Sequence, residues 1–203
     1  MENKKTILVT GSGAESKSVE KALRASGYNV RTGTPDQLSN CYGVFGATVD
    51  QQLLSTLYGS GVQHVVLLGS RETQTQDIPA TFVRIPFYYE NLLSQDLPRA
   101  EDKLAAASVE DIGPVVATIF DHPTLYIGRM VNVIGTDITS AEYSALAAKV
   151  LGVYVACNGV AVEQSIPNRQ LALIESYGLN PNMQTFELWL QKNKETLLDE
   201  AKA

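Results

Sequence analysis

Cysteine and histidine are scarce in this sequence, which restricts the chemistry that it can perform. The 203 residues include two cysteines, Cys41 and Cys157, and two histidines, His64 and His122. The cysteines are too far apart to suggest a disulfide framework or a zinc-ligand spacing. Neither histidine has a serine or cysteine beside it, so we assign both to structural roles. We therefore predict no catalytic residue, no metal site and a reducing compartment, the cytoplasm.

Long apolar runs and an excess of positive charge are also lacking. No stretch approaches the roughly 18 apolar residues of a membrane span, and the apolar run near the start is far shorter than that of a signal peptide. The 16 lysines and arginines are outnumbered by 22 aspartates and glutamates, which gives a formal net charge of −6. Such a charge disfavours phosphate backbones and anionic membranes. We expect neither nucleic acid nor a membrane as a partner.

What is present fits a folded α/β protein of about one domain. Hydrophobic residues make up 44% and aromatic residues 7%, so the core is mostly aliphatic. Residues 6–10 form a short, apolar run without alternation, which is typical of a strand buried on both faces of a parallel sheet. A glycine turn, a helical stripe over residues 16–26 ended by Gly27, and a second strand over residues 28–32 follow. Together these segments predict a βαβ unit.

The same pattern recurs further along the chain. Strands are expected over residues 42–47, 64–69 and 80–85. Asp50 is placed to cap a helix between the first two of these. We therefore predict an α/β fold with a Rossmann-like, doubly wound parallel sheet of five or six strands, whose first strand is central and flanked by the second and third. The connections over residues 33–41 and 70–79 are shorter than an ordinary helical crossover, which predicts a trimmed sheet.

The second half of the sequence is more helical. A helix start over residues 108–111, with Pro114 in an early turn, and capping-box spacing over residues 139–142 predict two helices, and a further helical stripe follows. We therefore predict a degenerate Rossmann-like NAD(P)-binding-type domain over residues 1–107. Residues 108–203 are expected to form a small, mainly helical C-terminal subdomain packed on the sheet.

The strongest local signal is the glycine-rich turn between the first strand and the first helix. Its candidate cofactor-binding residues are Gly11, Ser12, Gly13 and Ala14. Gly11 would allow a tight turn, and Gly13 would let a pyrophosphate approach the backbone amides at a helix N-terminus. Ser16, however, occupies the third position of G-x-G-x-x-G, where a side chain pushes helix and strand apart or narrows the phosphate seat. The turn is therefore either a working dinucleotide site or a turn that retains ancestral glycines without binding a dinucleotide.

Two further cofactor candidates follow the second and third strands. Arg31 is expected at the end of the second strand, where a basic residue tolerates the 2′-phosphate of NADP(H) and an acidic one would bind the ribose of NAD(H). This favours NADP(H), although an arginine solvated at a strand end explains the pattern equally well. Thr48 comes directly after the third strand and completes the candidates on this side.

A polar and aromatic segment follows the strand over residues 80–85. Its candidates are Tyr88, Tyr89, Glu90 and Asn91. Because open α/β sheets hold ligands at the carboxyl ends of their strands, we predict that this segment lines a pocket. The alternative is that Phe87 and Leu93 pack in the core while the polar residues merely open a helix.

Several segments resemble the NmrA-like family, atypical members of the short-chain dehydrogenase/reductase group. They are residues 84–93, residues 108–116, residues 139–143 and the last helix around Trp189 and Leu190. The chain looks most similar to the redox-sensor branch of that family. The resemblance implies a Rossmann-like fold, an NADP(H) site and a regulatory function exerted through a protein partner.

The chain also departs from the family pattern, and the departures concern the cofactor. The family turn reads G-x-x-G-x-x-G, whereas the matching positions here are Thr10, Gly13 and Ser16. Arg31 matches a basic family position, but the further arginine that meets the adenosine phosphate falls at about Pro35. We therefore expect NADP(H) binding to be weak or absent.

The residues that a reductase needs for catalysis are also missing. The resemblance places the reductase-type Tyr or His and Lys in a segment that is missing between Glu72 and Ile78, and no lysine occurs from Glu72 to Asn91. Hydride transfer needs a proton donor tuned by such a neighbour. We therefore predict a non-catalytic, redox-sensing or regulatory protein. The alternative is an enzyme that reduces, isomerises or rearranges a small-molecule ligand in the Tyr88 to Asn91 pocket, and the oligomeric state is left open.

Overall fold

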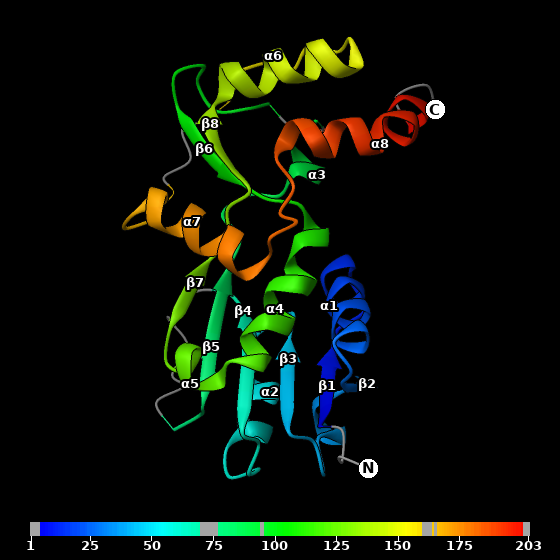
Figure 1. Ribbon diagram of the computed structural model, residues 1–203, viewed down its shortest axis with the longest axis vertical. Coiled ribbons are helices and arrows are strands. Elements are labelled where there is room, and N and C mark those ends of the chain that lie inside the picture. Colours follow the sequence, from blue (N-terminus) through cyan, green and yellow to red (C-terminus); the bar gives the residue numbers. More distant parts are fainter. Residues whose placement is uncertain (1–4, 70–76, 94–95, 160–163, 165, 201–203) are drawn as a thin grey trace. The chain divides into compact units, whose positions relative to one another are not determined.

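The computed structural model describes residues 5–69, 77–93, 96–159, 164 and 166–200 (Figure 1). The chain divides into two compact units, each built from two segments. Unit 1 comprises Met1–Arg84 and Val109–Asn132, and unit 2 comprises Ile85–Ser108 and Val133–Ala203. The predicted domain boundary after residue 107 stays a prediction. The segments of the two compact units alternate along the chain.

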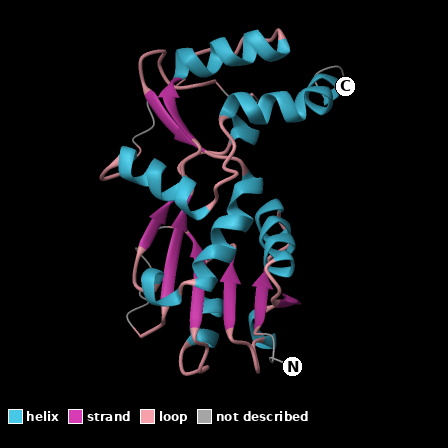
Figure 2. Ribbon diagram, viewed as in Figure 1, coloured by secondary structure: helices cyan, strands magenta, loops and turns pink. Residues whose placement is uncertain are grey.

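Unit 1 contains a parallel sheet of six strands in the order β2-β1-β3-β4-β5-β7. The strands are β1 (Thr6–Thr10), β2 (Asn29–Gly33), β3 (Gly43–Gly46), β4 (His64–Leu68), β5 (Ala80–Arg84) and β7 (Met130–Asn132). Every neighbouring pair is parallel, and in Figure 2 the arrows of β1, β3, β4, β5 and β7 point upward, while β2 is seen nearly end-on. The predicted doubly wound parallel sheet of six strands is therefore confirmed, and β1 is flanked by β2 and β3 as expected. However, β1 is the second strand of the order rather than a central one, and β7 is a strand that the sequence did not reveal.

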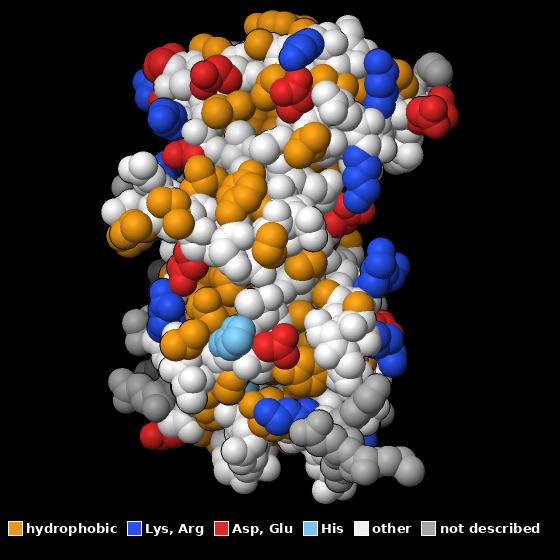
Figure 3. Space-filling view, viewed as in Figure 1, with side chains coloured by type: hydrophobic (Ala, Val, Ile, Leu, Met, Phe, Trp, Pro, Cys, Tyr) orange, Lys and Arg blue, Asp and Glu red, His pale blue; other side chains and the backbone are white. Residues whose placement is uncertain are grey.

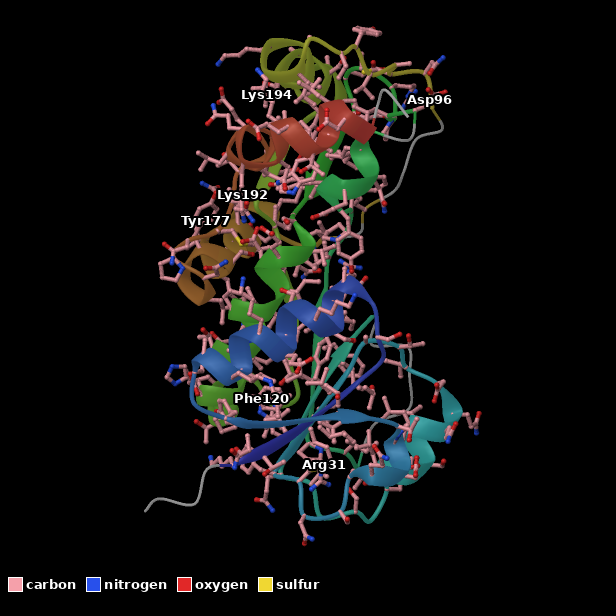
Figure 4. The ribbon with its side chains drawn as sticks, turned by 90° about the vertical axis from the view of Figure 1, so that its right-hand side faces the viewer. Arg31, Asp96, Phe120, Tyr177, Lys192 and Lys194 are labelled. Atoms are coloured by element: carbon pink, nitrogen blue, oxygen red, sulfur yellow. The ribbon has the colours of Figure 1, made fainter. Side chains whose placement is uncertain are left out.

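Both faces of this sheet are covered by helices, which explains why its strands lack alternation. On one face, Leu8 and Val44 pack with Leu53 of α2 (Gln51–Leu57). On the other, α1 (Ala14–Ala25) and α4 (Ile112–Asp121) lie side by side (Figures 1 and 4). Ser18 fixes this helix pair, because its hydroxyl accepts a hydrogen bond from the Gly113 N–H at 3.1 Å and donates one to the Glu110 carbonyl at 2.9 Å.

The predicted caps at Gly27 and Asp50 in unit 1 are confirmed by their geometry. Gly27 follows α1 with φ +88°, and the next N–H, that of Tyr28, bonds back to the Leu23 carbonyl at 3.0 Å. The Asp50 carboxylate accepts from the Leu53 N–H at 2.8 Å and so caps α2. Helix α1 begins at Ala14, two residues before the predicted start, because Gly13 rather than the following segment supplies the N-cap.

The short connections behave differently from ordinary crossovers. Between β2 and β3 the chain forms the single 3₁₀ turn η1 (Pro35–Gln37) instead of a helix. The other predicted short connection falls mostly on residues 70–76, which lie outside the described residues. The remaining elements of unit 1, η2 (Val109–Asp111) and α5 (Pro123–Tyr126), flank α4.

Unit 2 combines four helices with a two-stranded antiparallel sheet within its described residues. The helices are α3 (Tyr89–Leu92), α6 (Ser140–Leu151), α7 (Arg169–Leu179) and α8 (Phe186–Glu200), and the strands are β6 (Lys103–Ala106) and β8 (Thr136–Thr139). The predicted capping box opens α6: the Thr139 hydroxyl accepts from the Glu142 N–H, and the Glu142 carboxylate accepts from the Thr139 N–H at 2.7 Å. The helical prediction is thus confirmed, whereas the antiparallel strands were not predicted.

The core of unit 2 is aromatic. Tyr89, Tyr143, Phe186 and Trp189 belong to one buried cluster. The rings of Tyr143 and Phe186 meet edge to face at 4.9 Å, and those of Phe186 and Trp189 stack at 5.8 Å. Four of the 15 aromatic residues of the chain therefore pack together where α3, α6 and α8 meet.

The surface carries both signs of charge. On the face shown in Figure 3, lysine and arginine side chains are interspersed with aspartate and glutamate side chains. In the described part of the chain, no helix is long and apolar enough to cross a membrane.

Candidate functional site

The carboxyl end of β1 leads directly into the glycine turn and α1. Gly11 has φ +88°, a conformation that favours glycine. A Cβ at Gly11 would also lie 3.0 Å from Ser16 Oγ and 3.3 Å from Ala47 Cβ. Both the backbone conformation and the available space therefore require glycine at this position.

Ser16 is accommodated in a way that the sequence did not reveal. Its side chain is buried, and its hydroxyl donates to the Thr10 carbonyl at 2.9 Å. The hydrogen bond joins the start of α1 to the end of β1. Ser16 therefore bridges helix and strand through this hydrogen bond, and that its side chain widens their spacing or narrows the phosphate seat stays a prediction.

The backbone of the turn is open to a ligand. Gly11, Ser12, Gly13 and Ala14 are all exposed, and Gly13, as N-cap of α1, has no side chain that could occupy the first N–H groups. The first N–H groups of a helix lack intrahelical partners and carry partial positive charge. This arrangement fits a phosphate group, as in other strand-turn-helix anion sites.

One acidic side chain lies at the same place. Glu15 is the second residue of α1, and a Cβ at Gly13 would lie only 2.7 Å from its Oε2 atom. The carboxylate therefore folds back beside the N-cap. Sequence reasoning missed Glu15, although an acidic residue in the first turn of a helix is a recognisable signal.

Thr48 lies at the same edge of the sheet. It is exposed and follows Ala47, whose Cβ approaches the Gly11 position. The register pairs Thr10 with Gly46, so the ends of β1 and β3 are level. The structure thus brings Ala47, directly before Thr48, against the glycine turn, and a role of Thr48 in binding stays a prediction.

Arg31 is placed differently from the prediction. It pairs with Leu8 in the middle of β2, because the strand continues to Gly33 alongside β1. Its Nη1 donates to the Gln37 carbonyl at 2.8 Å and to the Ser39 carbonyl at 3.1 Å, so it holds the loop that contains η1 (Figure 4). The predicted position at the strand end is therefore wrong, and the preference for NADP(H) stays a prediction.

The segment from Tyr88 to Asn91 belongs to unit 2, and the structure places Tyr89 in the core. Tyr89 is fully buried. Its hydroxyl lies 2.8 Å from Thr136 Oγ1 and 3.1 Å from the Gln184 carbonyl oxygen, and its ring packs on Phe186 at 5.3 Å. Tyr89 therefore fills the core of unit 2, a role that neither reading of the segment gave it. Phe87 and Leu93, the packing residues of the alternative, lie partly buried against the same cluster.

The neighbours of Tyr89 are more accessible. Tyr88 is half-buried and forms an isolated bridge with Ala107. Glu90 and Asn91 are exposed, and the Glu90 carboxylate accepts from the Ser108 hydroxyl at 2.8 Å. That Tyr88, Glu90 and Asn91 line a ligand pocket stays a prediction.

One histidine and both cysteines are wholly or partly buried. His64 is fully buried on β4, where its Nε2 lies 2.8 Å from Thr81 Oγ1 and its ring meets Phe120 edge to face at 5.1 Å. Burial lowers the pKa of His64 to about 4. Cys41 and Cys157 are free and half-buried. The described residues contain no group of three His, Cys, Asp or Glu side chains that could hold a metal ion.

Comparison with known proteins places the fold. No family model matches the chain. NmrA, a negative transcriptional regulator, matches with a TM-score of 0.83 at 14% identity over 99% of both chains. NmrA in complex with NADP matches with a TM-score of 0.81 at 13% identity, over 100% of this chain and 99% of that one.

A reductase has the same fold with lower similarity. The triphenylmethane reductase of Citrobacter sp., complexed with NADP(H), matches with a TM-score of 0.66 at 13% identity, over 92% of this chain and 99% of that one. Likeness at such identities concerns the backbone rather than the chemistry. The chain therefore has the Rossmann-like fold of NmrA and its reductase neighbours.

Proposed function

We propose that the chain binds NADP(H) or NAD(H) weakly at the glycine turn and acts as a redox-sensing, regulatory protein through protein contacts. The observation that carries the proposal is the turn itself. Gly11 has a left-handed conformation, and exposed backbone N–H groups stand at the start of α1. The structures of NmrA with NAD and with NADP support the choice of ligand.

Weak binding follows from the loss of basic contacts around the adenosine end. Pro35 stands where the family resemblance implies an arginine, and Arg31 uses Nη1 to hold the carbonyls of the neighbouring loop. Each lost charge-assisted contact is worth about 1.5–3 kcal/mol, or about ten- to a hundredfold in affinity. We therefore expect a dissociation constant in the tens of micromolar or higher (~10⁻⁵ M).

A regulatory role is supported by the lack of the residues that hydride transfer needs. No lysine occurs between Glu72 and Asn91. The Tyr89 hydroxyl is held in the core of unit 2 by Thr136 and Gln184. A phenol needs a basic neighbour to act as an acid near neutral pH. Tyr89 has no lysine near it in this stretch of sequence, so it does not form the Tyr and Lys pair of a reductase.

The turn can be tested at Ser12, whose side chain is exposed. Ser12→Asp adds a negative charge beside the first N–H groups of α1, and we expect it to weaken NADPH binding about three- to tenfold. Ser12→Asn is the matched neutral control and should bind as the wild type does. Calorimetric titration measures both, and equal affinity of the two variants would contradict binding at this turn.

The regulatory role can be tested by comparing cofactor forms. A redox sensor must distinguish NADP⁺ from NADPH by affinity, because a ligand shifts a conformational equilibrium only through differential binding. We expect the two dissociation constants to differ and NADPH to persist in the presence of generic carbonyl and quinone substrates. Equal affinities would contradict redox sensing, and consumption of NADPH would favour the small-molecule enzyme instead.

A further inference from the structure

Helix α7 of unit 2 buries one side and exposes large apolar residues on the other. The buried side is anchored by Ser176, whose hydroxyl accepts a hydrogen bond from the Ile134 N–H at 2.9 Å. On the opposite side Leu171 and Ile174 each leave 62% of their surface exposed. In Figure 3, hydrophobic side chains reach the surface where α7 lies in Figure 1. The helix is therefore apolar on a side that the rest of the chain does not cover.

The exposed positions of α7 form an uncharged surface, which we call the outer face. All of α7 lies in the described part of the chain, and its exposed positions are Gln170, Leu171, Ile174 and Gly178. Residues three and four apart share one side of a helix, so Leu171, Ile174 and Gly178 form a row. A helix face in contact with water normally carries charged and polar side chains. The outer face therefore has the composition of a surface that another molecule covers.

The charged residues of α7 lie off this face. Arg169 forms an ion pair with Asp137 of β8 at 2.6 Å, and Glu175 is half-buried beside the row. With a formal net charge of −6, two copies of the chain repel each other at long range. An uncharged face is where two such chains can approach at the smallest electrostatic cost.

Gly178 gives the outer face a gap that nothing inside the chain explains. Its φ lies outside the left-handed region, and a Cβ at this position would meet no atom within 4 Å. Glycine inside a helix is less stable than alanine, so its presence there needs a reason. Neither the backbone nor a neighbouring side chain requires it. The missing side chain instead leaves room for a side chain from another molecule.

The outer face is complementary to itself. Ile174 is the middle residue of α7, so a two-fold axis beside it places two antiparallel copies of the helix with Ile174 against Ile174. Leu171 of each copy then comes within about one residue of Gly178 of the other, on the same side of the axis. The large side chain meets the gap at both ends of the contact. This reciprocal matching is what a two-fold symmetric interface requires.

We propose that the outer face of α7 is a self-association surface that binds a second copy of this chain through an antiparallel pair of α7 helices. A helix of 11 residues is about 16 Å long and about 10 Å wide. The contact is therefore much smaller than the ~800 Å² per partner of a stable interface. We expect a weak dimer with a dissociation constant on the order of 10⁻⁴ M. The inference goes beyond the proposed function, because it does not involve the glycine turn.

The test is the concentration dependence of the mass of the full chain, measured by analytical ultracentrifugation from ~10 μM to ~1 mM. The wild type should be largely monomeric at the lower concentration and partly dimeric at the higher one. Ile174→Glu places two like charges on the axis and should weaken association at least about tenfold. Leu188→Glu is the matched control, because it introduces the same charge at a leucine of α8 that is 53% exposed. This control should associate as the wild type does.

Gly178→Gln separates a lost contact from a damaged fold. Glutamine favours a helix more than glycine does, so this variant should melt at a higher temperature than the wild type. Its side chain fills the gap that receives Leu171 of the second copy, so association should be about tenfold weaker. A gain in stability together with a loss of association is the result expected from the proposed contact.

Each contrary outcome overturns the inference. A wild type that stays monomeric at ~1 mM would assign the outer face to a different protein. Equal association of the wild type and Ile174→Glu would place the contact elsewhere, and equal loss in Ile174→Glu and Leu188→Glu would attribute the loss to net charge alone. Unchanged association of Gly178→Gln would contradict the antiparallel pairing. NADPH titration of Ile174→Glu should match the wild type, so failure of the proposed function would appear there and not in the ultracentrifugation.

Discussion

Burial of His64 makes the stability of unit 1 depend on pH at a single side chain. The imidazole is fully buried against Phe120 and Thr81, so its charged form is disfavoured and its pKa falls to about 4 from an ordinary 6.5. In the unfolded chain the same group binds its proton near pH 6.5. The contribution of His64 to the free energy of unfolding is therefore fully present above pH 6.5. It is lost progressively as the pH falls toward 4.

We expect acidification from pH 7 to 4 to cost about 3 kcal/mol of unfolding free energy through His64. The measurement is the difference in the pH dependence of urea midpoints between the wild type and His64→Gln. His122→Gln serves as the control, because His122 is exposed at the end of α4. A His64→Gln variant with the same pH dependence as the wild type would disprove this account.

At the scale of elements, the boundaries that the sequence predicts are those encoded locally. The glycine turn, the Asp50 cap and the Thr139 to Glu142 capping box depend on a few neighbouring residues, and each is confirmed. Strand β6 reads Lys-Leu-Ala-Ala, a helix-favouring composition, and exists because it pairs with β8. Such strands cannot be read from local pattern.

In the candidate site, too, the features that depend on neighbouring residues were predicted, and those that depend on the three-dimensional fold were not. The turn from Gly11 to Ala14 was predicted because its backbone demands are local. The bond from Ser16 to the Thr10 carbonyl and the place of Glu15 depend on how side chains fold back in three dimensions. Sequence also cannot distinguish an aromatic residue that lines a pocket from one that fills a core, which is why Tyr89 was included among the candidates.

Helix α3 and its flanks give a prediction that separates packing from binding. Tyr89→Ala should lower the unfolding free energy by about 3–5 kcal/mol, because it empties core volume beside Phe186 and Trp189. Asn91→Ala, on an exposed position of the same helix, should change stability little and weaken ligand binding if the segment lines a site.

Denaturant unfolding and NADPH titration on both variants provide the measurement for α3. Unchanged NADPH affinity in Asn91→Ala would remove this segment from the site. A stable Tyr89→Ala protein would show that the aromatic cluster of unit 2 is not the source of its stability.

At the scale of the whole molecule, ligand binding should be visible as stabilisation. A ligand that binds only the folded state adds RT ln(1 + [L]/Kd), so ~1 mM NADPH with a dissociation constant of about 50 μM adds about 1.8 kcal/mol. For a chain of this length that corresponds to a rise of a few degrees in melting temperature. A thermal shift of more than about 10 °C would indicate tight binding and contradict the weak site.

The interleaving of the two units has a consequence for the order in which the chain can fold during synthesis. Helix α4 and strand β7 of unit 1 follow the Ile85–Ser108 segment of unit 2 along the chain. Until Phe120 has left the ribosome, the sheet face beside Gly43 and His64 lacks the aromatic ring that covers it. The nascent protein therefore exposes this apolar face of unit 1 while Ile85–Ser108 of unit 2 is being synthesised. During that period the exposed face is a surface that chaperones would bind.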